Sequence, residues 1–176
     1  MRHSGLKAIH VRAAPGTRAR GWLTAGLQSF PVALGRGGIL ANKREGDGGT
    51  PRGVFRPRRL WWRADRLPRP GTSLPVCRIA ADDAWCEDPA DRRYNRPLKM
   101  AAGEAGDRLR RDDHLYDLIV EIDHNTRPRI AGRGSAVFIH LARPGLAPTA
   151  GCIAMPKARL RHLLAKIGAG TRIVIR

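Results

Sequence analysis

Acidic residues are scarce in this chain of 176 residues, which carries 15 Asp and Glu against 33 Lys and Arg. The formal net charge of +18 implies an anionic partner or an anionic environment. Nucleic acid, an anionic polymer such as cell wall, and a merely solvated basic surface are the three interpretations. No nucleic acid is expected as partner, because the charge is spread along the chain and no zinc-finger, basic-zipper or RNA-binding aromatic pattern is present.

Long apolar runs and cysteines are also few. No apolar run approaches the ~20 residues that a membrane-spanning helix needs, so no transmembrane segment is expected. The basic start, Met1–Lys7, is not followed by the apolar stretch of a secretory signal. Cys77, Cys86 and Cys152 do not make a disulfide scaffold, and Cys77 and Cys86 either pair or are small buried residues. No set of residues has zinc-like spacing, so no metal is expected.

The rest of the sequence predicts one mainly β domain. Hydrophobic residues make up 42% of the chain, which is enough for an ordinary core. Strand-like segments with Gly and Pro between them are residues 8–11, 21–24, 30–34, 54–56, 60–62, 118–122, 136–140 and 171–175. A helix is predicted over 156–167, where leucines recur at helical spacing, and Gly168 ends it. The helix therefore precedes the final strand.

Residues 63–114 differ from their surroundings. They are polar, rich in Pro, Asp and Arg, and weakly periodic. So long a stretch inside a compact domain is more often a lid or a substrate loop than a plain connection. A surface excursion without function is the alternative.

The segment from Ile139 to Pro156 carries the candidate chemistry. His140 ends a predicted buried strand, and Cys152 follows Gly151 further along. An imidazole can deprotonate a thiol to give a nucleophilic thiolate, and a helix directly after Cys152 would favour that thiolate. Backbone N–H groups around Cys152 are candidate oxyanion donors. From the residues alone a structural Cys and His stay open, and His124 is a rival base.

Two separated motifs resemble the L,D-transpeptidase (YkuD) catalytic domain family. That family has a His at a strand end, a variable loop and then Ser-x-Gly-Cys-Ile/Val-Arg, which the segment from His140 to Ala154 resembles. The run Thr50–Phe55 is similar to the Thr-Pro-x-Gly-x-Phe run found earlier in the same domain. The resemblance covers roughly residues 8–175. It implies a β-sandwich or barrel, with 1–176 as a single catalytic domain and 63–114 as a lid or insertion.

The resemblance also implies a reaction and its residues. Cys152 matches the nucleophile and His140 the general base, whose imidazole the backbone carbonyl of Leu141 would orient. Gly151 and Cys152 match the oxyanion region. Cys152 would attack the diaminopimelate carbonyl of a peptidoglycan tetrapeptide stem and release D-Ala, and an amine of a second stem would resolve the thioester. No cofactor is implied, carbapenems are expected as covalent inhibitors, and the location is expected to be the periplasm.

Several departures from the family pattern bear on the substrate. Thr149 replaces Ser and keeps the hydroxyl, Ala150 stands where many members have His, and Ala154 stands where most have Arg. Arg143, on the intervening loop, is the candidate replacement for that cation. The loop is shorter than in most members. These features resemble a branch from Alpha- and Betaproteobacteria, associated with linking diaminopimelate to the N-terminal L-Ala of another stem.

Further residues are candidates for shaping the substrate pocket. They are Trp85, Tyr94 and Asn95 in the polar segment and His124 and Asn125 at a strand end. Each also has a purely structural interpretation. Two alternative functions stay open: an L,D-carboxypeptidase or amidase in which water resolves the thioester, and a basic nucleic-acid-binding module. The sequence does not choose between an L-Ala amine, a diaminopimelate amine and water as acceptor.

Overall fold

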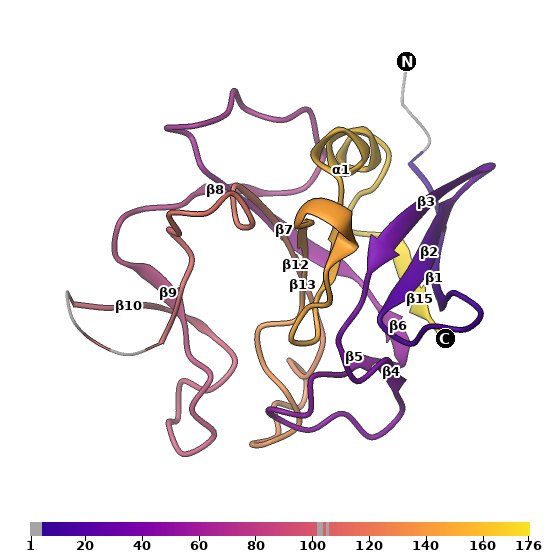
Figure 1. The fold of residues 1–176 in the computed structure, drawn as a ribbon. Helices are drawn as coiled ribbons and strands as arrows, with labels where there is room; N and C mark the ends of the chain where they lie inside the picture. Colours follow the sequence, from indigo (N-terminus) through magenta and orange to yellow (C-terminus); the bar gives the residue numbers. More distant parts are fainter. Residues whose placement is uncertain (1–4, 102–103, 105) are drawn as a thin grey trace.

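The chain folds mainly as β-strands, with a single α-helix in the part that the structure describes (Figure 1). The computed structural model describes residues 5–101, 104 and 106–176. Residues 1–4 of the predicted domain, and residues 102, 103 and 105 of the 63–114 segment, lie outside the described residues. Within the described ranges, no helix is long and apolar enough to cross a membrane. The prediction of a mainly β fold with a helix before the last strand is confirmed.

A curled ten-stranded sheet forms the body of the molecule. Its strands, in spatial order, are β6 (Gly53–Phe55), β15 (Arg172–Ile175), β1 (Ala8–Ala13), β2 (Arg20–Ala25), β3 (Gln28–Ala33), β14 (Ile153–Met155), β13 (Phe138–Leu141), β12 (Leu118–Ile122), β7 (Pro57–Trp62) and β8 (Val76–Arg78). Two small sheets complete the strands: β10 (Pro97–Lys99), β9 (Asp83–Trp85) and β11 (Asp107–Arg108) in one, and β4 (Ile39–Leu40) with β5 (Thr50–Pro51) in the other.

Strand β13 lies in the middle of the large sheet and separates two hydrophobic clusters. Its side chains alternate between the two faces, as in any strand. Ile139 and Leu141 belong to the main cluster, whereas Phe138 belongs to a second cluster that also contains Cys152. Residues two apart share a face of a strand, so His140 lies on the same face as Phe138. The pleat of one strand therefore places His140 on the side of the sheet where Cys152 lies.

The helix lies where the leucine spacing predicts it, but not directly after Cys152. Helix α1 (Lys157–Leu164) buries Leu160, Leu163 and Leu164 in the main cluster. Strand β14 and Pro156 stand between Cys152 and α1. The favourable charge at a helix N-terminus falls off within the first turn. The prediction that this helix stabilises a Cys152 thiolate is therefore wrong.

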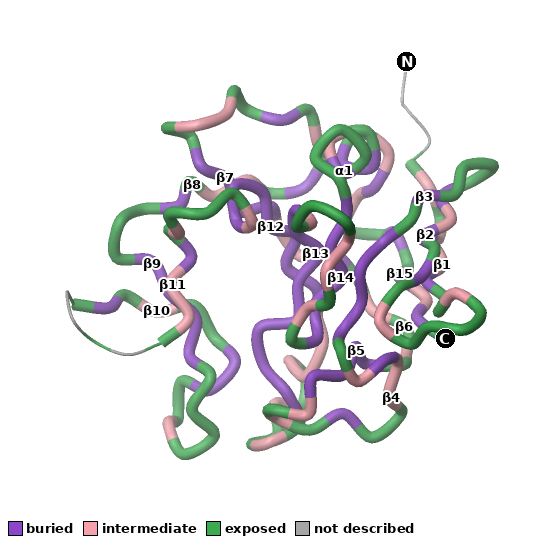
Figure 2. The backbone as a smooth tube through the Cα atoms, in the orientation of Figure 1, coloured by how far each residue is buried: buried purple, intermediate pink, exposed green. Residues whose placement is uncertain are grey.

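Residues 63–114 contain more regular structure than their composition indicates. Strand β8 extends the large sheet, and β9, β10 and β11 form a sheet of their own beside it (Figure 2). Trp85, Tyr94 and Leu109 are buried, within a segment that is otherwise exposed over much of its length (Figure 2). The Trp85 ring stands edge-on to the Phe138 ring, with 5.0 Å between centroids. This segment therefore packs against the strand that carries His140.

Candidate active site

His140 is held in one orientation and in one tautomer. Its side chain is buried, and Nδ1 lies 2.8 Å from the carbonyl oxygen of Leu141. A carbonyl oxygen only accepts hydrogen bonds, so Nδ1 carries the proton and Nε2 keeps its lone pair. Burial lowers the pKa of His140 to about 4. The imidazole is therefore neutral at pH 7, with Nε2 available to take up a proton.

Cys152 is a buried neutral thiol in this structure. Sγ donates a hydrogen bond to the carbonyl oxygen of Ala136 at 3.1 Å and accepts one from the backbone N–H of Phe138 at 3.4 Å. Burial raises the pKa of Cys152 to about 12. A neutral thiol and a neutral imidazole thus face the same side of the sheet.

The backbone beside Cys152 is fixed by the hydroxyl of Thr149. The Thr149 Oγ1 atom donates to the carbonyl oxygen of Cys152 at 2.6 Å and accepts from the N–H of Gly151 at 3.1 Å. The hydroxyl that Thr149 retains in place of Ser therefore has two partners. Because the Gly151 N–H is engaged there, the N–H of Cys152 is the remaining oxyanion candidate of the two.

Gly151 lies where a side chain has no room. Its φ is +146°, and a Cβ built on it would lie 2.8 Å from the carbonyl oxygen of Gly49. The position of Gly49 is set by Asp47, which accepts hydrogen bonds from Gly49 N at 2.8 Å and from Lys43 Nζ at 2.6 Å. The loop before Thr50 therefore lies in close contact with Gly151, the residue before Cys152.

The two sequence motifs meet in space. Thr50 Oγ1 accepts a hydrogen bond from the N–H of Gly35 at 2.9 Å. Gly35 in turn bridges to Thr149, and the N–H of Arg36 donates to the Thr149 carbonyl oxygen at 3.0 Å. The motif near residue 50 and the motif near residue 150 are thus connected by backbone contacts of Gly35 and Arg36, which follow β3.

A cavity of about 320 Å³ opens over Cys152 and His140. It is lined by Arg36, Arg111, Leu115, Tyr116, His140, Arg143, Ala147, Pro148, Thr149, Ala150, Cys152 and Ala154. Four predicted site residues therefore share one space: the thiol, the imidazole, Arg143 and Thr149. Gly151 and Leu141 support it through their backbone.

Tyr94, His124 and Asn125 are not among the residues that line this cavity. Tyr94 donates a hydrogen bond to Glu45 and accepts one from the N–H of Gly134 at 3.0 Å. The Asn125 amide donates to the Gly134 carbonyl oxygen at 3.0 Å, and His124 Nε2 lies 3.1 Å from the Arg133 carbonyl oxygen. The three side chains hold the chain that leads into β13.

Sequence analysis did not single out Tyr116 and Arg111, which line the cavity together with His140. The Tyr116 ring stands edge-on to the imidazole, with 5.3 Å between centroids. The Tyr116 hydroxyl donates to Asp107 at 3.1 Å, and the Arg111 guanidinium lies 5.0 Å from the Tyr116 ring centroid. The one available signal was the apolar pair Leu115–Tyr116 at the end of a polar segment.

Asn95 connects the 63–114 segment to the site. Its Oδ1 accepts hydrogen bonds from Trp85 Nε1 at 3.0 Å and from the N–H of Ala136 at 3.2 Å. Its Nδ2 donates to the carbonyl oxygens of His124 and Asn125 at 3.0 and 2.9 Å. A buried amide that makes four hydrogen bonds holds the segments that it contacts in place. Asn95 thereby holds Ala136, whose carbonyl oxygen accepts the hydrogen bond of the Cys152 thiol.

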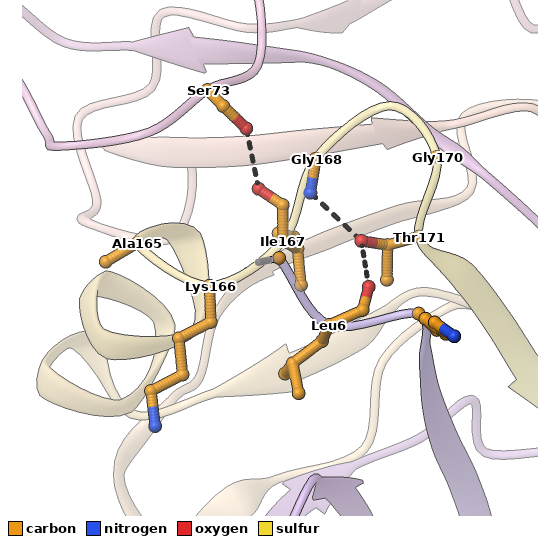
Figure 3. Close-up of a pocket in the computed structure, with 10 residues that line it drawn as sticks. Leu6, Ser73, Ala165, Lys166, Ile167, Gly168, Gly170 and Thr171 are labelled. Atoms are coloured by element: carbon orange, nitrogen blue, oxygen red, sulfur yellow. Dashed lines mark hydrogen bonds between the residues drawn. The ribbon is translucent and has the colours of Figure 1, made fainter. Parts of the chain in front are cut away.

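A second cavity, of about 630 Å³, lies between the N-terminal segment and the loop after α1 (Figure 3). Its hydroxyl groups are used inside the protein. Ser73 donates to the Ile167 carbonyl oxygen at 3.2 Å, and Thr171 donates to the Leu6 carbonyl oxygen at 2.7 Å (Figure 3). No Cys, His or carboxylate is among its lining residues in the described chain. The titratable side chains of this cavity are Lys7 and Lys166, and Lys166 Nζ donates a hydrogen bond to Gln28 at 3.2 Å.

Comparison with known families agrees with the motifs. The family model described as "L,D-transpeptidase catalytic domain" (YkuD) matches residues 9–175. This chain therefore belongs to the L,D-transpeptidase catalytic domain family. It is also similar to a crystal structure of Mycobacterium tuberculosis L,D-transpeptidase 1, at 13% sequence identity and a TM-score of 0.40. That similarity covers 96% of this chain and 61% of the mycobacterial chain. No curated protein matches this chain.

Proposed function

We propose that this chain is a peptidoglycan L,D-transpeptidase that uses Cys152 as nucleophile and His140 as base. Membership of the family supports this activity, and it also supports a location outside the cytoplasm, which we take to be the periplasm. The observation that carries the residue assignment is the shared cavity. Cys152 and His140 line the same space, and the Nδ1–H of His140 is bound to Leu141, so that Nε2 is left as the base.

The first half of the reaction forms a thioester. As Sγ of Cys152 attacks the diaminopimelate carbonyl of a tetrapeptide stem, its proton passes to Nε2 of His140. The N–H of Cys152 donates to the oxyanion that develops on the attacked carbonyl. Collapse of the tetrahedral intermediate breaks the bond to D-Ala, whose nitrogen takes the proton from Nε2. Starting from a neutral pair avoids the cost of a charged pair in the buried resting site.

The second half transfers the acyl group to an amine of another stem. Nε2 of His140 removes a proton as the amine attacks the thioester, and the same proton returns to Sγ when the thiol leaves. The features that resemble the Alpha- and Betaproteobacterial branch, the short loop between His140 and Cys152 among them, favour the N-terminal L-Ala amine as acceptor, with the diaminopimelate amine as the alternative. Water in place of the amine would make the same site an L,D-carboxypeptidase.

We also assign the whole chain to one catalytic domain, in which residues 63–114 form an insertion that shapes the site. The insertion supplies Arg111 to the cavity wall, and Asn95 holds Ala136 from outside the cavity. Carbapenems fit this assignment as inhibitors that acylate Cys152. No metal is needed, because the described residues provide a nucleophile and a base.

The test is incubation of the purified protein with diaminopimelate-type tetrapeptide muropeptides, followed by tandem mass spectrometry. The proposal expects cross-linked dimers that depend on Cys152 and His140 and are absent with Cys152→Ala and His140→Ala. Fragmentation of the dimers names the acceptor amine. Loss of D-Ala without dimers would replace the transpeptidase by the carboxypeptidase. Intact muropeptides with a folded protein would overturn both.

A further inference from the structure

We propose that Arg36 and Arg143 form a subsite for the terminal carboxylate of the stem's D-Ala, the leaving group of the reaction proposed above. This inference rests on the proposed function and names a determinant of its substrate choice. Both arginines line the cavity that contains Cys152 and His140. They come from chain segments more than a hundred residues apart in sequence.

The cavity wall is cationic. Its charged side chains in the described chain are Arg36, Arg111 and Arg143, and no carboxylate is among its lining residues. Arg111 already has a partner, because its Nε and Nη2 donate to Asp113 at 2.9 and 2.7 Å. Within the described residues, Arg36 and Arg143 have no carboxylate within 4.0 Å and donate no side-chain hydrogen bond. Two guanidinium groups are thus free to bind an anion.

Arg36 is exposed, and its side chain packs against the backbone of a neighbouring loop. Its side chain lies over Gly48, where an added Cβ would come within 2.8 Å of Cγ, 2.9 Å of Nε and 3.1 Å of Cζ. Its backbone N–H is bound to the carbonyl oxygen of Thr149. Gly48 has a φ of +68°, a conformation that glycine adopts without strain. Because Gly48 has no side chain, its backbone leaves room for the Arg36 guanidinium next to the site.

Arg143 lines the same cavity as the imidazole that would protonate the leaving group. Burial is the main cause of the low pKa of His140, and the positive charges of Arg111 and Arg143 add to it. Arg143 is therefore within Coulombic reach of the imidazole. The loop that follows it is tied down by Arg20, whose Nη2 donates to the Gly145 carbonyl oxygen at 2.7 Å. In the proposed reaction the nitrogen of D-Ala takes its proton from His140, and Arg143 on the wall of the same cavity offers a cation to the carboxylate of that residue.

The substrate chemistry follows from the guanidinium group. Arg presents a planar fork that matches a carboxylate, and hydrogen bonds between charged partners are shorter and stronger than neutral ones. Ala154, also on the cavity wall, leaves the position after the Cys-Ile pair without a cation. The leaving D-Ala carries the one carboxylate that lies immediately beyond the bond to be broken. Arg36 and Arg143 therefore select a stem that ends in a free carboxylate.

Calorimetric binding to Cys152→Ala, which cannot turn over, tests the subsite. The ligands are the same tetrapeptide stem ending in a D-Ala carboxylate or in the corresponding carboxamide. We expect the carboxylate form to bind at least about tenfold more tightly. Adding Arg36→Gln and Arg143→Gln together should abolish this preference. Adding Arg12→Gln, an exposed arginine on β1, should leave it unchanged.

Equal binding of the two peptides to Cys152→Ala, absence of binding by both, or a preference that survives the double substitution would each overturn the subsite. Thermal unfolding of every variant separates loss of binding from loss of fold. The experiments distinguish an error in the subsite from an error in the proposed function. Cross-linking by the unsubstituted protein that ignores the terminal carboxylate removes only the subsite, whereas a carboxylate preference without any turnover removes only the transpeptidase.

Discussion

The side-chain oxygen of Asn95 accepts a hydrogen bond from the backbone N–H of Ala136 at 3.2 Å, across 41 residues of sequence. The carbonyl oxygen of Ala136 accepts a hydrogen bond from the thiol of Cys152. Ala136 has a φ of +50°, a conformation that L-residues other than Asn and Asp rarely adopt. A residue of the 63–114 segment thus holds a strained residue that contacts the nucleophile directly.

Asn95→Ala is expected to destabilise the protein by about 2–3 kcal/mol, because the buried donors of Trp85 and Ala136 lose their acceptor. Turnover should fall as well, since Ala136 is then free to move away from Cys152. Chemical denaturation and muropeptide turnover measure the two effects. Asn42→Ala, at an exposed asparagine, is the matched control and should change neither. Unchanged turnover in Asn95→Ala would contradict a link between this segment and the site.

The buried imidazole makes stability depend on pH. In the folded chain His140 stays neutral down to about pH 4, whereas in the unfolded chain it takes up a proton near its usual pKa of 6.5. The unfolded state binds more protons between these values, so stability is lost as pH falls from 6.5 towards 4. We expect this loss to reach about 3 kcal/mol at pH 4 and below.

His140→Gln has no group that titrates in this range and should lack that part of the pH dependence. Denaturant midpoints measured at half-unit steps between pH 7 and pH 4 compare the two proteins. Parallel curves for the parent and His140→Gln would show that His140 titrates alike in the folded and unfolded chains.

The neutral thiol predicts slow alkylation. With its pKa raised to about 12 by burial, Cys152 holds very little thiolate at pH 8. A variant with Cys152 as its one cysteine (Cys77→Ser, Cys86→Ala) should react with iodoacetamide at least about a hundredfold more slowly than a variant that keeps only the half-buried Cys77. Its rate should keep rising beyond pH 10. Fast alkylation of Cys152 at pH 7 would indicate a thiolate and imidazolium pair instead.

Gly151→Ala should abolish turnover. The new Cβ would lie 2.8 Å from the Gly49 carbonyl oxygen, closer than carbon and oxygen atoms approach, and backbone must shift to relieve the contact. The shift displaces Cys152, the next residue. Turnover and thermal unfolding of Gly151→Ala are compared with Gly71→Ala, where a Cβ meets nothing within 4 Å. Full activity of Gly151→Ala would show that this backbone does not need its close approach to Gly49.

Local patterns were sufficient for much of the fold. Alternation and β-branched residues predicted the segments that became β1, β12 and β15, and leucine spacing predicted α1. Strand β14 was missed, because three apolar residues between Cys152 and Pro156 carry no alternation to read. That strand becomes central only through its pairing with β13 and β3, which no local pattern encodes.

Only part of the candidate site was predicted, because local patterns do not encode contacts between distant segments. Cys152 and His140 stand in a motif and end up in one cavity. Arg36 is one of many arginines in the chain, and only its contact with Gly48 and Thr149 distinguishes it. Asn95 was one of several pocket candidates from the sequence, and its four partners lie in three separate segments. Non-local contacts of this kind become visible only in the folded chain.

Intact-protein mass spectrometry of the acyl-enzyme tests the central claim most directly. The protein is mixed with tetrapeptide stem, stopped with acid after short times, and weighed. The proposed mechanism predicts an added mass equal to the mass of the stem minus the mass of the released D-Ala, mapped by digestion to Cys152 and absent in Cys152→Ala. His140→Ala should form it far more slowly. Product formation without an adduct on Cys152, or an adduct on Cys77 or Cys86 instead, would contradict Cys152 as the nucleophile.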